Sequence, residues 1–241
     1  MYKSPLTILL FAVVASCNTQ PQNEYVPQNE AKNAKAASYG RMKLDFTEPV
    51  QIDTTSYVMF PLTIAHDDNR FMIKSSGEEF SHWNMIFLNT KTGEYHLLDT
   101  VRQMLIKGYD AGESSSRSET DGKSSTTGGH LFYEIITDDT NYDGKLDEND
   151  PVFLFMSDKE GENFKQISPA NYHLRSWKLI NETGKVLMYA VNQKEMKQDY
   201  QEQQVAVFVY DIKSGAPARP AFSTDFINGA KKLFNEHWVK K

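Results

Sequence analysis

Three segments of this chain share one pattern, and that pattern is the strongest constraint on its fold. Each has an apolar run rich in β-branched and aromatic residues, then a short polar turn that ends in glycine, then a second strand-like run. The apolar runs are residues 85–88, 152–156 and 205–210, and the turns end at Gly93, Gly161 and Gly215. Such runs broken by glycine turns predict antiparallel hairpins. The sequence therefore predicts a mainly β, antiparallel fold.

Further strands are expected at residues 172–180 and around Trp83 and Trp177. The three hairpins resemble the outer hairpins of bacterial β-propeller blades, similar to those of the periplasmic Tol-system protein. Closed propellers have four or more blades, and a weak fourth hairpin could come from residues 50–52 and 57–60. The resemblance implies a small or incomplete β-propeller-like domain. The alternative is a β-sandwich, because hairpins of this kind occur in every β fold.

The C-terminus carries a different period. Ser223 can cap a helix, and apolar residues follow it at helical spacing. These residues are Phe226, Ile227, Ala230, Leu233 and Phe234. We expect a short C-terminal helix that docks this stripe on the sheet.

Residues 139–150 place oxygen-bearing side chains at the ligand spacing of a twelve-residue calcium loop. Ca²⁺ takes six to eight oxygen ligands, so the chain must turn alternate side chains inward around the ion. Gly144 stands at the sixth position, where the backbone turns sharply. The expected ligands are Asp139, Asn141, Asp143, the backbone carbonyl of Lys145, Asp147 and Asp150.

This loop resembles EF-hand loops of the dockerin type, which end in aspartate. Tyr142 and Pro151 depart from that pattern, and the flanking residues 131–136 and 152–156 read as strands rather than helices. We therefore expect a calcium loop set between strands, with Leu146 pinning it to the core. The alternative is an acidic turn without an ion, since Asp, Asn and Gly favour turns in any case.

The N-terminus carries a short apolar run that ends at a cysteine. Residues 1–16 read as a signal peptide whose apolar run is too short to span a bilayer. The peptide ends before Cys17, in Val14-Ala15-Ser16-Cys17, which resembles a lipobox. Cys17 is the only cysteine of the chain, and acyl groups on it would anchor the protein to the membrane. Asn18 resembles default sorting to the bacterial outer membrane; an ordinary secretory signal is the alternative.

Three regions follow from these features. Residues 1–16 are the signal peptide, residues 17–40 are the lipidated cysteine and a flexible tether, and residues 41–241 are one mainly β domain. Within it, residues 111–129 are polar enough to predict a disordered loop. Removing Lys3 with the signal peptide leaves 25 basic and 32 acidic residues, a net charge of −7. Such a chain is not expected to bind nucleic acid.

The sequence contains no Gly-x-Ser-x-Gly or His-Glu-x-x-His motif, so we do not expect an enzyme. The expected function is that of a membrane-anchored, calcium-binding lipoprotein that serves as a binding or structural module of the cell envelope. Its protein or glycan ligand is not specified by the sequence. The alternative is an envelope hydrolase of carbohydrate or peptide metabolism on a propeller-like scaffold.

Overall fold

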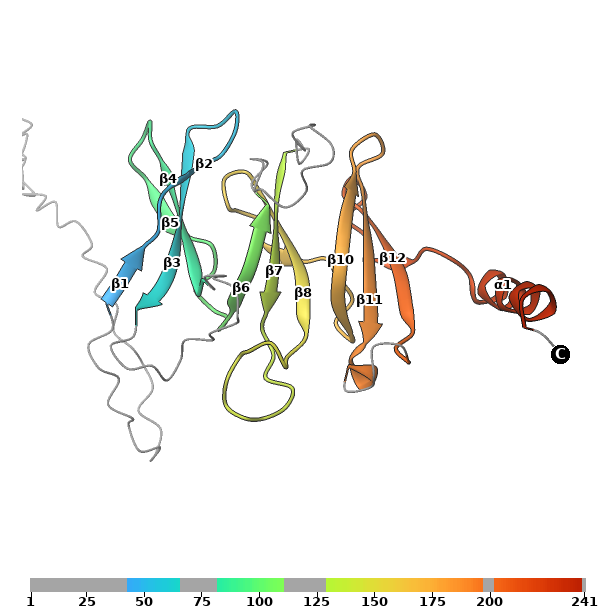
Figure 1. Ribbon diagram of the computed structural model, residues 1–241. Helices are drawn as coiled ribbons and strands as arrows, with labels where there is room; N and C mark the ends of the chain where they lie inside the picture. The colour runs from blue at the N-terminus through green and yellow to red at the C-terminus, as the bar shows by residue number, and fades with distance from the viewer. Residues whose placement is uncertain (1–42, 66–81, 111–128, 197–201, 240–241) are drawn as a thin grey trace, which may run out of the picture. The chain divides into compact units, whose positions relative to one another are not determined.

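The computed structural model describes residues 43–65, 82–110, 129–196 and 202–239 (Figure 1). All of them belong to one compact unit, Gly40–Lys241. The expected signal peptide, Cys17 and the tether lie outside the described residues, as does the expected disordered loop apart from Gly129.

The described strands form three antiparallel sheets, each built from strands that follow one another in sequence. The first sheet comprises β1 (Lys43–Phe46), β2 (Val50–Gln51), β3 (Tyr57–Ala65), β4 (Asn84–Asn89) and β5 (Tyr95–Leu97). The middle sheet comprises β6 (Leu105–Asp110), β7 (His130–Ile136), β8 (Val152–Asp158) and β9 (Lys165–Gln166). The last sheet comprises β10 (Tyr172–Ile180), β11 (Lys185–Asn192), β12 (Val205–Asp211) and β13 (Arg219–Pro220). A 3₁₀ turn, η1 (Gln193–Glu195), follows β11, and helix α1 (Thr224–His237) follows β13. The predicted mainly β, antiparallel fold with a short C-terminal helix is confirmed.

The three glycine hairpins are present, and each joins the last two strands of its sheet. Gly93, Gly161 and Gly215 all adopt positive φ, at 77°, 82° and 63°. An Asx side chain at the end of the preceding strand caps each turn by accepting from the backbone two residues on. The acceptors are Asn89 in the first sheet, Asp158 in the middle sheet and Asp211 in the last. The three hairpins predicted from the sequence therefore share one turn motif, in which an Asx side chain accepts a hydrogen bond from the backbone N–H two residues on.

The middle sheet is buried on both faces, and this explains its nearly continuous apolar strands. In β7, Tyr133 belongs to the core shared with the first sheet, together with Phe87. Its neighbour Phe132 belongs to the core shared with the last sheet, together with Met188. Because successive strand residues point to opposite faces, β7 and β8 supply side chains to both cores.

The expected fourth hairpin is not a separate blade. Val50–Gln51 pairs with β3, and β3 pairs with β4, so both segments complete the first sheet. The register explains this outcome, because Met59 of β3 lies opposite Phe87 of β4 and shares its core. Three sheets that do not close among the described residues fit both an incomplete propeller-like fold and the alternative, a β-sandwich.

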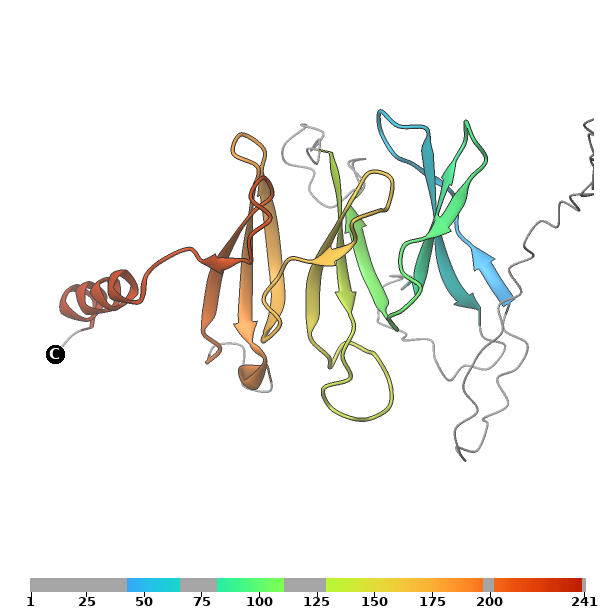
Figure 2. The same cartoon turned by 180° about the vertical axis from the view of Figure 1, so that it is seen from behind.

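Helix α1 begins as expected, with the Ser223 hydroxyl accepting from the Phe226 N–H at 3.2 Å. The expectation that its apolar stripe docks on the sheet is wrong. No residue of α1 is buried, and Phe226 and Phe234 are 62% and 58% exposed. Figure 2 shows the chain leaving the last sheet and continuing into the helix.

Candidate functional site

The acidic loop connects β7 to β8, two central strands of the middle sheet. These strands are paired along their whole length, and the last pair before the loop is Ile136 with Val152. Ile136 is fully buried and Val152 nearly so, so both ends of the loop are held by the core. Leu146 packs against the same core, as expected from the sequence. The expected position of the loop between two strands is confirmed.

The first half of the loop turns its polar side chains inward. The Asp139 carboxylate accepts from the N–H groups of Gly144 at 2.8 Å and Asp143 at 3.2 Å. The Asn141 side-chain oxygen accepts from the Asp143 N–H at 2.9 Å, and the Asp143 carboxylate accepts from the Lys145 N–H at 2.9 Å. Gly144 has φ of 83°, the conformation that its position in the pattern requires. Asp139, Asn141 and Asp143 are therefore brought together around one turn of backbone.

The second half of the loop uses its carboxylates differently. Asp150 is fully buried, and one of its oxygens accepts from the Thr140 N–H at 2.8 Å. Its other oxygen accepts from the Asp147 N–H at 3.2 Å, while Asp147 itself accepts from the Asn149 N–H at 2.9 Å. Asp150 thus ties the start of the loop to its end. The first oxygen also accepts from the Thr140 hydroxyl at 3.2 Å, so only the oxygen that accepts from the Asp147 N–H keeps a further lone pair.

The described part of the chain contains no group of three or more His, Cys, Asp or Glu side chains placed to hold a metal ion together. The structure therefore brings Asp139, Asn141 and Asp143 together without gathering Asp147 and Asp150 around the same point. The donor chemistry still fits Ca²⁺, because every candidate ligand is an oxygen. The candidate ligands therefore fit Ca²⁺ by the kind of atom that they offer. The first three side chains also fit it by their inward orientation.

Sequence reasoning did not single out His173, which lies beside the exit of the loop. Its Nδ1 accepts from the Val152 N–H at 3.1 Å, so β10 is fastened to the start of β8. Burial is the main cause that lowers the pKa of His173 to about 4, with smaller contributions from the nearby positive charges of Arg175 and Lys107. The ring is therefore a neutral acceptor at neutral pH. No sequence signal indicates this role, because it depends on the packing of two strands that are not neighbours in one sheet.

His82 is buried, whereas His173 is only partly buried. The His82 backbone N–H donates to the Ile106 carbonyl at 3.0 Å, and the Ile106 N–H donates back at 2.7 Å, which joins the first sheet to the middle one. Burial lowers the pKa of His82, and its ring lies 6.0 Å from the Tyr109 ring. Backbone pairing and aromatic packing hold this residue in place, while its buried Nδ1 has no hydrogen-bond partner among the described residues.

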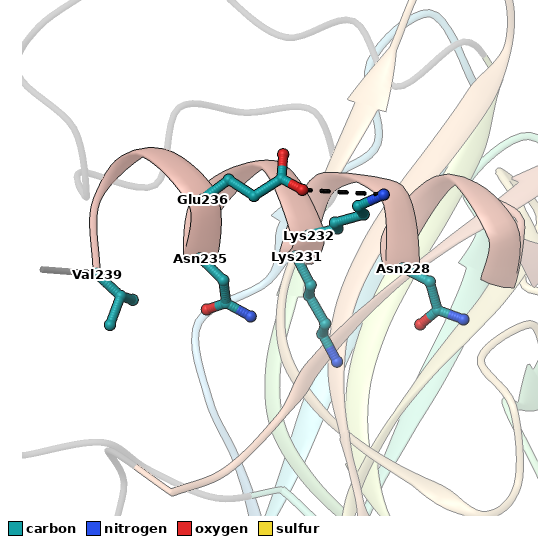
Figure 3. Close-up of a pocket in the computed structure, with 6 residues that line it drawn as sticks. All are labelled: Asn228, Lys231, Lys232, Asn235, Glu236 and Val239. Atoms are coloured by element: carbon teal, nitrogen blue, oxygen red, sulfur yellow. Dashed lines mark ion pairs between the residues drawn. The ribbon is translucent and has the colours of Figure 1, made fainter. Parts of the chain in front are cut away.

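A shallow hollow lies along α1, and Figure 3 shows the side chains that line it. They are Asn228, Lys231, Lys232, Asn235, Glu236 and Val239. All come from the helix and the residues at its end, so the hollow is the polar side of one helix rather than a cleft between elements. Within it, Lys232 and Glu236 form an exposed ion pair at 3.8 Å. This surface offers no converging groups for catalysis.

Within the described ranges, no helix is long and apolar enough to cross a membrane. No protein-family model matches this chain, and a search of curated proteins finds no match either.

Proposed function

We propose that this protein is a membrane-anchored, calcium-binding lipoprotein that acts as a binding or structural module of the bacterial cell envelope. In this proposal Cys17 carries the lipid anchor, most simply in the outer membrane, and the β domain presents a surface to a protein or glycan ligand. The protein is a binder rather than an enzyme. The proposal that the loop binds calcium is supported by the inward orientation of Asp139, Asn141 and Asp143 around Gly144.

In the proposed site Ca²⁺ is held by the carboxylates of Asp139, Asp143, Asp147 and Asp150, the Asn141 amide oxygen and the Lys145 carbonyl. The first three side chains already face into the turn, which supports their assignment. Asp150 would bind the ion through Oδ2, which accepts only from the Asp147 N–H, because Oδ1 already accepts from both the N–H and the hydroxyl of Thr140. Bound calcium would offset the repulsion between the four carboxylates proposed as its ligands.

The function of such a site is structural in this proposal. The loop connects β7 to β8, which supply both hydrophobic cores, so fixing the loop stabilises the hairpin at the centre of the fold. The acidic net charge disfavours nucleic acid as a partner. In this proposal Cys17 anchors the protein to the membrane, and the β domain binds the ligand.

The calcium proposal is tested by thermal unfolding of the chain in excess Ca²⁺ and in excess chelator. Extracellular calcium modules bind with dissociation constants on the order of 10⁻⁴ M. About 10 mM Ca²⁺ would then stabilise the fold by about 2.7 kcal/mol. This corresponds to a rise in melting temperature of roughly 5–10 °C for a domain of this size.

Asp143→Ala removes a central ligand from an exposed position and should abolish the calcium-dependent rise. Asp138→Ala is the matched control, because Asp138 is an exposed acidic residue directly before the loop and outside the ligand pattern. It should leave the rise intact. Equal melting of the unmodified chain with calcium and with chelator, together with no heat of calcium binding by calorimetry, would show that the loop is an acidic turn.

A further inference from the structure

Helix α1 leaves its apolar side exposed. At 100° per residue, the apolar side chains of the helix gather on one side. These are Phe226, Ile227, Ala230, Leu233 and Phe234. No residue of the helix is buried, Leu233 is 58% exposed, and Trp238 at the end of the helix is 77% exposed. A helix of this pattern gains most of its stability from the surface on which its apolar side packs.

The chain just before α1 is held in place while the helix stays away from its own sheet. The Ala221 N–H donates to the Val207 carbonyl at 2.8 Å, which fixes the chain at the sheet edge. The Phe222 ring stacks on the Phe226 ring with 5.6 Å between their centroids, and the Ser223 hydroxyl caps the helix. These contacts are made with the apolar side of α1 uncovered, so that side is available to another surface.

The C-terminal segment also differs in charge from the rest of the chain. Residues 224–241 contain four lysines against Asp225 and Glu236, a net charge of +2. Residues 17–223 contain 21 basic and 30 acidic residues, a net charge of −9. By net charge, a negatively charged surface therefore attracts the segment that contains α1 and repels the remainder.

One lysine of α1 lies at the border of the apolar side. Lys231 follows Ile227 by four residues, so the two side chains are neighbours on the helix surface. Lys232 forms the exposed ion pair with Glu236, whereas Lys231 has no ion-pair partner among the described residues. Figure 3 shows the Lys231 side chain extending away from the helix. A lysine at such a border can lay its aliphatic stem along an apolar layer and keep its ammonium group at a charged surface.

The end of the helix has the composition of a membrane interface. Trp238 is followed by Val239, Lys240 and Lys241. Tryptophan is enriched where the apolar and aqueous layers of a membrane meet, because its ring is amphipathic. The helix has 14 residues, which is too few to span a bilayer, so an amphipathic helix of this kind lies in the plane of the interface.

We propose that α1 binds the surface of an anionic phospholipid membrane, with its apolar side in the acyl layer and Lys231 among the headgroups. Such a surface offers an apolar layer directly beneath a layer of negative charge, and α1 offers the complementary pair. This contact goes beyond the proposed function. It depends on neither calcium nor a lipid on Cys17.

Vesicle flotation tests the contact with the chain from residue 18 onward, which contains the whole compact unit Gly40–Lys241 and lacks the proposed lipidation site. We expect the chain to float with phosphatidylglycerol vesicles, to bind phosphatidylcholine vesicles weakly, and to be released by added salt. Tryptophan fluorescence should shift to shorter wavelength on binding. Trp238→Phe should still float but lose most of that shift, because the shift reports entry of Trp238 into the interface.

Two matched pairs of variants separate the apolar contribution from the charge. Phe234→Gln should weaken binding to phosphatidylglycerol vesicles by about tenfold, whereas Asn235→Gln, on the polar side of the helix, should bind like the unmodified chain. Lys231→Gln should weaken binding by about fivefold. Lys213→Gln, at an exposed lysine in the turn after β12, is its control and should have no effect. All four positions are exposed, so circular dichroism should show unchanged β content.

Three results would overturn the proposal. The first is no binding to either kind of vesicle. The second is equal binding to phosphatidylglycerol and phosphatidylcholine, and the third is equal binding by Phe234→Gln and Asn235→Gln. A dimeric mass by light scattering together with absent vesicle binding would assign the apolar side of α1 to a second copy of the chain. Because this chain carries no lipid and the assay contains no calcium, its outcome is independent of the anchor and of the calcium loop.

Discussion

Replacing Gly161 with alanine tests how tightly the first and middle sheets are packed against each other. Gly161 ends the turn between β8 and β9 with φ of 82°. A Cβ at this position would lie 2.5 Å from two ring carbons of Phe87, which is fully buried in the first sheet. The His96 ring stacks on the same Phe87 ring at 5.5 Å, and His96 Nε2 lies 2.9 Å from the Glu160 carbonyl oxygen. The turn therefore presses its backbone directly on the core of the neighbouring sheet.

Two costs add in Gly161→Ala. Alanine in a left-handed conformation costs about 1–2 kcal/mol, and overpacking a well-filled core costs about 1–3 kcal/mol. We expect the free energy of unfolding to fall by about 2–5 kcal/mol. Gly93→Ala is the matched control, because Gly93 ends the equivalent turn of the first sheet with φ of 77° and has no atom within 4 Å of the added Cβ. It should lose only the conformational cost, about 1–2 kcal/mol.

Urea denaturation of the two variants measures the difference, and a double-mutant cycle assigns its cause. Phe87→Leu is itself destabilising but removes the ring that the new Cβ would strike. Gly161→Ala should therefore cost less in the Phe87→Leu background than in the unmodified chain, by about 1 kcal/mol or more. If Gly161→Ala and Gly93→Ala cost the same, or if the two positions 87 and 161 act additively, the close packing inferred between the sheets is wrong.

Three further predictions concern the pH dependence of stability, the membrane anchor and residues 111–129. The pKa of His173 is lowered from 6.5 to about 4, so its contribution to stability is present above pH 6.5 and is lost as the pH falls through about 4. The shift corresponds to about 3 kcal/mol at most, and solvent screening of this partly exposed ring reduces it to about 1–2 kcal/mol. His173→Asn keeps an acceptor for the Val152 N–H without a titrating ring, and should flatten the fall in melting temperature between pH 6.5 and 4; an unchanged slope would contradict the assignment. Cys17→Ser should move the protein out of the membrane fraction or leave an unprocessed precursor, and normal processing with full membrane retention would refute the anchor. Limited proteolysis should cut first within residues 111–129 and leave a folded remainder, as measured by mass spectrometry and circular dichroism; first cuts within the strands would contradict this prediction.

The hairpin turns, the helix cap and the first half of the acidic loop follow from contacts between residues that are near one another in the chain. Along a strand, apolar residues alternate with polar ones where one face is covered, and follow one another where both faces are covered. The turns require positive φ at Gly93, Gly161 and Gly215. The hairpins could therefore be located from short-range patterns. The same holds for the Ser223 cap of α1 and for the inward turn of Asp139, Asn141 and Asp143 around Gly144. In each of these cases the partners lie within five residues of one another.

The grouping of strands into sheets and the contacts between side chains of different sheets depend on long-range packing. The pairing of Met59 with Phe87 assigns residues 57–60 to the first sheet instead of a fourth blade. The bond between His173 and Val152, and the turn of Asp150 toward Thr140 and Asp147, likewise depend on backbone positions that a spacing rule does not specify. The exposure of α1 follows the same logic. Helical periodicity determines that Phe226 and Leu233 lie on one side, but the surface that covers them depends on long-range packing, whose free energy is a property of the assembled fold.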